Sequence, residues 1–187
     1  MNTSTFTRFT NGIRHSMLAL AILGAGASHS MAQDDHAHMD AIKRDQSSNA
    51  SAFLKIVRDS TERFKDVSAA MAEGYILQFG CVSGSDSGAM GLHYVNANLV
   101  SLGILDPTRP QIVIYEPMPD GKMALVAVEY ITFKGPASLE GQLFNFNGAP
   151  NRYGLDPFYE LHVWAWKANP RGAYADMNPD VSCAHAH

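Results

Sequence analysis

The sequence is short of positive charge, with 14 lysines and arginines against 18 aspartates and glutamates and a formal charge of −4. Because a polyanion is repelled by a negatively charged protein, we expect no nucleic-acid partner. The glycine-rich segment 83–88 lacks the lysine that a phosphate-binding loop requires, and no metal-binding motif of the HExxH type is present. No compact motif therefore indicates a function, and any functional site must combine residues from separate segments of the chain.

Long hydrophobic runs are also lacking. The apolar stretch 17–27 is too short to span a bilayer and remain there, and it follows Arg8 and Arg14 as the apolar part of a secretory signal does. We predict that residues 1–32 are a signal peptide cleaved after Ala32 and that residues 33–49 form a flexible polar segment. The mature protein would be periplasmic or secreted, with no stable membrane span.

Cysteine is scarce, with only Cys81 and Cys183 in the whole chain. In an exported protein the first expectation is that the two form a disulfide bond. Two free thiols, or a pair of metal ligands, are the alternatives. A disulfide would hold the C-terminal tail against the segment that follows the first helix.

Residues 50–187 are enough for a single domain with its own core. The apolar residues of 51–73 recur at spacings of three, four and seven, which predicts an amphipathic helix ended by Gly74. The strand-like segments that follow are joined by turns without crossover helices between them. We therefore predict an α+β fold, in which the N-terminal helix packs on an antiparallel, barrel-like sheet.

The segment 111–133 contains two apolar runs joined by a turn at 117–121, which predicts a β-hairpin. Glu116 and Glu129 lie inside these runs, where an ionised carboxylate needs a partner or a route to water. The period of two along strands places both on one face, with Glu129 opposite Ile112. The two glutamates would be about 13 Å apart along the strands, too far for one ion unless a bulge redirects one strand.

Two further segments carry histidine. His93 is expected on a strand over 90–95, on the face opposite its neighbours Leu92 and Tyr94. In 158–166, alternation places His162 on one face with Glu160 and two tryptophans, and the aliphatic residues on the other. This face is either a second packing surface or an aromatic wall beside His162.

Four motifs resemble a family of small, uncharacterised, exported bacterial proteins. They are MGLHYVN at 90–96, IVIYEP at 112–117, LVAVEY at 125–130 and ELHVWAWKANPRGAYADMNPDVSC at 160–183. The resemblance covers most of the predicted mature chain. It implies export and a single domain, and no particular substrate, cofactor or catalytic residue.

From the residues themselves we predict a metal site formed by His93, Glu129 and His162, with Glu116 as a substitute. Two histidines and a carboxylate with open positions suit a divalent transition metal such as Zn, Fe, Mn or Cu, and the hydrolytic or oxygen chemistry of a mononuclear metalloenzyme. The ligands would come from three separate strands.

The alternative is a non-catalytic module that binds a small apolar or aromatic molecule, with the same histidines and glutamate supplying hydrogen bonds. Its pocket would be lined by four aromatic residues: Tyr94, Tyr130, Trp164 and Trp166. A face that binds another protein is the third interpretation. The sequence does not decide whether the protein is an enzyme.

Overall fold

The computed structural model describes residues 28–186, so most of the predicted signal peptide lies outside the described residues. The chain divides into two units, Met1–Asp40 and Ala41–His187. Within the described part of the first unit the backbone is helical. Among the described residues, no helix is long and apolar enough to cross a membrane.

The helical region begins earlier than the sequence pattern indicates. Helix α1 covers Ser28–Thr61, so the backbone of 33–49, for which we predicted no regular structure, is helical. This helical backbone tests neither the predicted signal cleavage nor the predicted domain boundaries, and both stay predictions.

The predicted amphipathic helix over 51–73 is interrupted. After α1 come a short 3-10 helix η1, Glu62–Lys65, and helix α2, Val67–Ala72. Asp66 lies between them in an extended conformation and caps α2, because its carboxylate accepts a hydrogen bond from the Ser68 amide at 2.9 Å. A cap of this kind begins a new helix and so separates α2 from α1.

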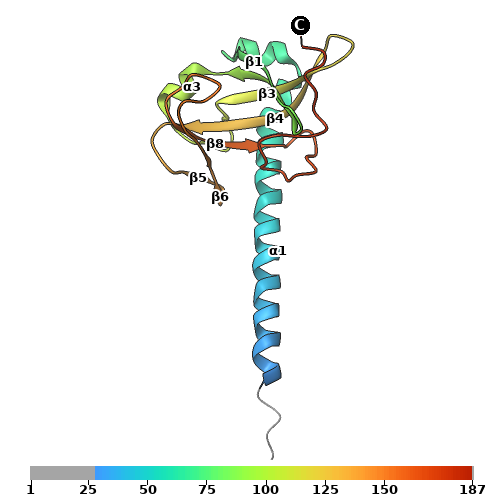
Figure 1. Ribbon diagram of the computed structural model, residues 1–187, viewed down its shortest axis with the longest axis vertical. Coiled ribbons are helices and arrows are strands. Elements are labelled where there is room, and N and C mark those ends of the chain that lie inside the picture. Colours follow the sequence, from blue (N-terminus) through green and yellow to red (C-terminus); the bar gives the residue numbers. More distant parts are fainter. Residues whose placement is uncertain (1–27, 187) are drawn as a thin grey trace, which may run out of the picture. The chain divides into compact units, whose positions relative to one another are not determined.

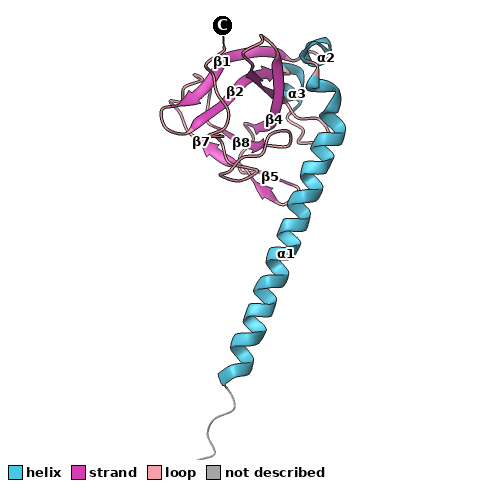
Figure 2. Ribbon diagram, turned by 90° about the vertical axis from the view of Figure 1, so that its right-hand side faces the viewer, coloured by secondary structure: helices cyan, strands magenta, loops and turns pink. Residues whose placement is uncertain are grey.

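The second unit is built on a six-stranded antiparallel sheet in the order β1-β2-β3-β4-β8-β7, which curls into a half-barrel (Figures 1 and 2). This confirms the predicted α+β class. The main strands are β1 Ile76–Gly84, β2 Gly88–Val95, β3 Ile112–Pro117, β4 Met123–Thr132 and β8 Phe158–Val163. The smaller elements are helix α3 Ala97–Leu102 and strands β5 Ser138–Leu139, β6 Gln142–Leu143 and β7 Asn145–Asn147.

The β3–β4 hairpin has the predicted register at its open end, where Ile112 pairs with Glu129. A bulge after Ile114 places Tyr115 opposite Leu125. The bulge reverses the alternation on the turn side of it, so Leu125 packs with Tyr115 and does not share the face of Glu129.

The two faces of the sheet bury different residues. One face, which we call the helix face, packs against α1, η1 and α2; its core includes Phe53, Val57, Phe64, Tyr94, Val113, Tyr115, Val128, Tyr130, Leu161 and Val163. The other, which we call the site face, has an apolar core of Ala89, Ile112, Ile114, Val126, Ala127, Ile131, Phe158, Trp164 and Val181. Apart from the bulge in β4, which puts the neighbours Val126 and Ala127 on the same face, alternation along β2, β4 and β8 directs every second side chain to the site face.

A disulfide and a backbone bridge fasten the C-terminal tail to the sheet. Cys81 and Cys183 form the predicted disulfide, with their Cα atoms 5.7 Å apart. Asn178 pairs with Ala89 through two backbone hydrogen bonds of 3.0 and 3.1 Å. The approach is so close that a Cβ on Gly88 would lie 2.1 Å from the Asn178 carbonyl oxygen, which only glycine accommodates.

Candidate metal centre

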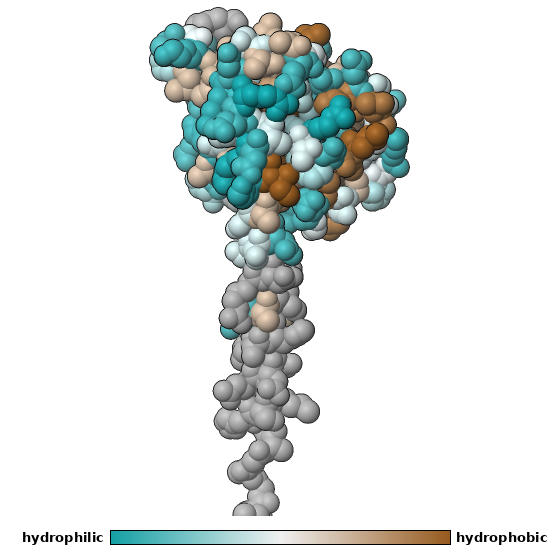
Figure 3. All heavy atoms as spheres, turned by 180° about the vertical axis from the view of Figure 1, so that it is seen from behind, coloured by the Kyte–Doolittle hydropathy of each residue, from teal (hydrophilic) through white to brown (hydrophobic). Residues whose placement is uncertain are grey.

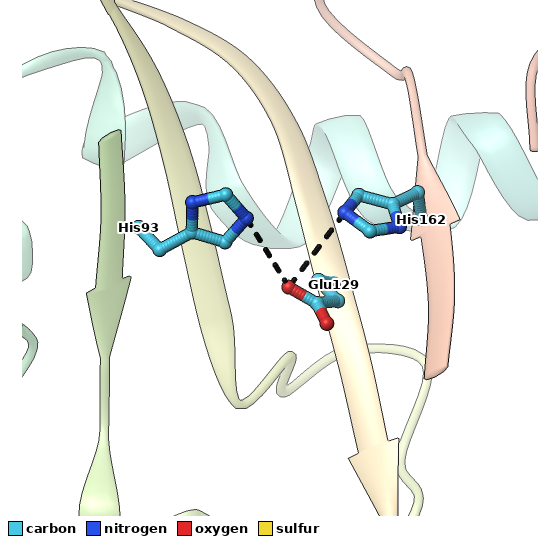
Figure 4. A group of neighbouring side chains, drawn as sticks. All are labelled: His93, Glu129 and His162. Carbon is cyan, nitrogen blue, oxygen red and sulfur yellow. Dashed lines mark ion pairs between the residues drawn. The ribbon is translucent and has the colours of Figure 1, made fainter. Parts of the chain in front are cut away.

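Three strands bring His93, Glu129 and His162 together on the site face. His93 comes from β2, Glu129 from β4 and His162 from β8, where it is the direct partner of Glu129 (Figure 4). The Nε2 atoms of His93 and His162 lie 3.6 and 3.8 Å from the same carboxylate oxygen, Oε2 of Glu129. All three residues are buried, and one ligand atom from each lies within 4.8 Å of the others. Such a buried group could hold a metal ion.

The backbone fixes the orientation of His93. Its Nδ1 lies 3.1 Å from the Gly91 carbonyl oxygen, which can only accept a hydrogen bond, so Nδ1 carries the proton. The lone pair of the neutral ring is then on Nε2 and faces Glu129. Burial, and next the electrostatic influence of the nearby His162 ring, lower the pKa of His93 from 6.5 to about 3, which keeps the His93 ring neutral at physiological pH.

His162 is the most deeply enclosed member, with no exposed surface. Neither of its ring nitrogens has a hydrogen-bond partner, and no other buried side-chain nitrogen or oxygen of the described residues lacks one. Its Nδ1 faces the carboxylate of Asp176 at 3.7 Å, while its Nε2 faces Glu129. A buried unpaired polar atom costs about 1–3 kcal/mol, so two on one ring demand a physical reason.

The surroundings of Glu129 favour the protonated, neutral form of its carboxyl group. Burial is the main cause that raises its pKa well above 4.5, followed by the charge of Glu160, a hydrogen bond with it, and the charge of Asp176. Glu160, His162 and Asp176 form a second group that could hold an ion, and it shares His162 with the first. Asp176 is itself held by the Asn145 side-chain amide, which donates to it at 2.8 Å. Carboxylates thus face His162 from two sides.

Two cavities meet at this cluster. A small one of about 20 Å³ is lined by His93, Glu129, Glu160 and Tyr153, together with apolar residues. A polar pocket of about 460 Å³ approaches from the loop over 147–153 and is lined by Glu160 and Asp176. Since Glu160 and Tyr153 border both spaces, they separate the buried cavity from the polar pocket.

Glu116, the substitute ligand, lies elsewhere. Its carboxylate accepts hydrogen bonds from Lys167 Nζ at 2.6 Å and from the Ser182 amide at 3.0 Å. Both carboxylate oxygens are therefore engaged, and Glu116 fastens the tail to the end of β3. The structure does not bring it to His93 and Glu129.

The four aromatic residues predicted to line one pocket are divided between different regions. Tyr94 and Tyr130 lie in the helix-face core, whereas Trp164 lies in the site-face core. Strand β8 ends at Val163, so the alternation stops there, and Trp166 turns to the helix side, where its Nε1 donates to Thr61. Trp164 and Trp166 nevertheless share the lining of a cavity of about 490 Å³, to which Tyr94 and Tyr130 do not contribute.

Sequence reasoning missed three members of the cluster. Glu160 was placed on the correct face but was not chosen as a ligand. Asp176 lies in an irregular tail whose path no periodicity predicts, and Tyr153 lies in a long loop. The pKa of Tyr153 is raised by burial and next by the charges of Glu129 and Glu160, so the phenol stays protonated. The signal that could have found Glu160 was its spacing of two from His162.

Comparison with family models, curated proteins and solved structures finds no match to this chain.

Proposed function

We propose that this is an exported protein that binds one divalent transition metal through His93, Glu129 and His162, as a mononuclear metalloenzyme does. The observation that carries the proposal is the buried His162 ring with both nitrogens unpaired. A cation would use the Nε2 lone pair, and Asp176 would accept the proton on Nδ1. Carboxylate, histidine and metal arranged in this order are the usual surroundings of a metal-bound histidine.

A purely hydrogen-bonded cluster accounts for the geometry less well. A neutral Glu129 could donate to one histidine only, and the distances of 3.6 and 3.8 Å exceed those of a hydrogen bond. Around one ion, by contrast, nitrogen and oxygen ligands at about 2.1 Å lie up to roughly 4.2 Å from each other. Both measured distances fall within that limit.

The donor set and its surroundings suit catalysis better than a closed structural site. Two imidazoles and one carboxylate leave positions open, and Zn, Fe, Mn and Cu all accept such ligands. The small cavity beside His93 and Glu129 gives those positions space for a water or a substrate atom. Hydrolytic or oxygen chemistry is the activity class this arrangement favours.

The test is a cobalt titration of the chelator-treated full chain, followed by absorption and by elemental analysis. We expect one Co²⁺ per chain, and at least 100-fold weaker binding in Glu129→Gln and in His162→Ala. Glu116→Gln is the matched control, because it makes the same change in a carboxylate that is paired with Lys167. Binding that survives Glu129→Gln, or that falls equally in Glu116→Gln, would refute the proposal.

Export is a separate part of the proposal and needs its own experiment. The disulfide is compatible with an oxidising compartment. We expect protein recovered from the periplasm or the medium to have the intact mass of a chain cleaved after Ala32. Retention of the N-terminus on a membrane would contradict this.

A further inference from the structure

A large apolar cavity adjoins the candidate metal centre. It has a volume of about 600 Å³, within the range of small-molecule sites, and lies between the start of β1, α3 and the β4 end. None of the described residues that line it carries a charge. Several apolar side chains at its rim are exposed, including Ile76 at 64 %, Phe79 at 49 % and Phe133 at 45 %. Figure 3 shows apolar residues gathered along one side of the folded unit.

This cavity lies directly beside the small cavity of the metal centre. The two share four lining residues: Phe79, Ile112, Ile131 and Leu155. Ile112 is also the β3 partner of Glu129, so the apolar wall passes directly into the polar cluster. A molecule in the large cavity would therefore contact residues that also line the small cavity of His93 and Glu129.

Phe79 stands at the junction in an unusual conformation. Its backbone φ angle of +63° is one that residues other than glycine rarely adopt. Phe79 lies where the pairing of β1 with β2 is irregular, between Gln78 and Cys81. The ring packs edge-on to Tyr153 at 5.2 Å between centroids. Backbone strain of this kind persists where the surroundings impose it, and here it holds an aromatic ring between the two cavities.

Size and charge define the ligand. The polar cavity of about 20 Å³ has room for one water-sized group. An anionic end would meet Glu129 and Glu160, whereas a hydroxyl can both donate to a carboxylate and coordinate a cation. We propose that the protein binds a neutral, mainly apolar molecule with a terminal hydroxyl, such as an alkylphenol, with its body in the large cavity and its oxygen at the metal centre. This inference rests on the proposed metal-binding function.

The experiment measures binding of three probes to the zinc-loaded full chain by equilibrium dialysis: 4-heptylphenol, heptylbenzene and 4-heptylbenzoate. We expect the phenol to bind about tenfold more tightly than either of the others, since only it fills the apolar cavity and also pairs at the polar end. Val100→Trp, which fills the cavity from α3, should weaken phenol binding at least tenfold. Leu102→Trp, on the same helix but outside the lining, should leave it unchanged.

Cobalt titration of the same proteins separates the two proposals. If Val100→Trp binds cobalt with unchanged affinity but no longer binds the phenol, the result supports the ligand site. If Val100→Trp does not fold, Ala97→Trp, at an exposed position of the cavity lining, takes its place. Equal affinity for all three probes, or equal loss in Val100→Trp and Leu102→Trp, refutes the ligand proposal and leaves the metal centre standing. Absence of cobalt binding in the wild type refutes both.

Discussion

The two faces of the sheet differ in how completely their buried polar groups are hydrogen-bonded. On the helix face, three tyrosine hydroxyls are deeply placed and each donates to a backbone carbonyl oxygen at 2.7 Å: Tyr75 to Pro110, Tyr115 to Phe64 and Tyr130 to Pro107. On the site face, Glu129 and the two histidines approach one another without a normal hydrogen bond between them. Complete pairing is what a structural core requires, so the incomplete pairing on the site face is the contrast on which the proposed metal centre rests.

This contrast predicts that changes on the helix face will act on stability and changes on the site face will act on binding. The largest effect is expected at Phe53, which is fully buried and packs against Tyr130 and Tyr174 with centroids at 5.9 and 6.1 Å. Phe53→Ala should lower the free energy of unfolding by about 3–5 kcal/mol through the cavity it leaves. Urea denaturation measures this, and cobalt affinity of the folded fraction should not change. A lost metal site in Phe53→Ala would break the division between the faces.

The disulfide should affect both properties, because it fastens the tail that carries Asp176. The bridge joins residues separated by 102 positions, and its removal in the Cys81→Ser, Cys183→Ser double variant should destabilise the fold by about 2–5 kcal/mol. Cobalt affinity should fall as well, since the carboxylate behind His162 is less firmly held. Chemical denaturation and cobalt titration test the two parts. Unaltered metal binding would show that Asp176 is positioned without the bridge.

The pH dependence of the metal-free protein should reveal His93. The pKa of His93 is about 3 in the folded state and about 6.5 in the unfolded state. Its contribution to the free energy of unfolding is therefore present above pH 6.5 and is lost as the pH falls toward 3. Between pH 6.5 and 4.5 the loss amounts to about 2–3 kcal/mol. Glu129 acts oppositely: its raised pKa gives stability below about pH 4.5 that is lost as pH rises. Stability curves of the wild type and His93→Gln should therefore diverge on the acid side, and parallel curves would contradict this.

The smallest effects form a matched pair of opposite sign. Tyr115→Phe removes a paired hydroxyl and should destabilise the protein by about 1 kcal/mol, because the Phe64 carbonyl loses its donor. His162→Met removes two unpaired nitrogens and should stabilise the metal-free protein by about 1 kcal/mol while abolishing metal binding. Thermal unfolding of chelator-treated samples compares them. Destabilisation by His162→Met would indicate that the ring is satisfied in solution.

The period of two predicted which face of its own strand each of His93, Glu129 and His162 occupies, since each lies between apolar neighbours. That the three faces coincide was a hypothesis, and the structure brings the three residues together. Ile112 pairs with Glu129 as predicted, but near the turn Pro117 pairs with Met123, one residue away from the predicted register, and the bulge after Ile114 restores the predicted pairing at the open end. What could not be predicted depends on single events with little local signal. The bulge after Ile114 redirected Leu125, and the end of β8 at Val163 redirected Trp166.

The remaining site residues depend on tertiary contacts. Asp176 reaches His162 because Asn178 pairs with Ala89 and Asn145 holds its carboxylate, and none of these contacts is local in sequence. The division of the predicted helix at Asp66 has a recognisable capping pattern, yet the apolar spacing that continues through it suggests an unbroken helix.

The dispersal of the ligands along the chain has a consequence for the order of events in biosynthesis. His93 lies near the middle of the chain, His162 and Asp176 follow near its end, and the pairing of His93 with either closes a long loop of chain. A partly synthesised chain would therefore contain isolated histidines and carboxylates with little affinity for any ion. On the proposed function, metal capture would be the final step of maturation and would take place in the compartment where the finished chain folds and its cysteines are oxidised. The cation available there, rather than intrinsic preference alone, would decide which metal the protein carries.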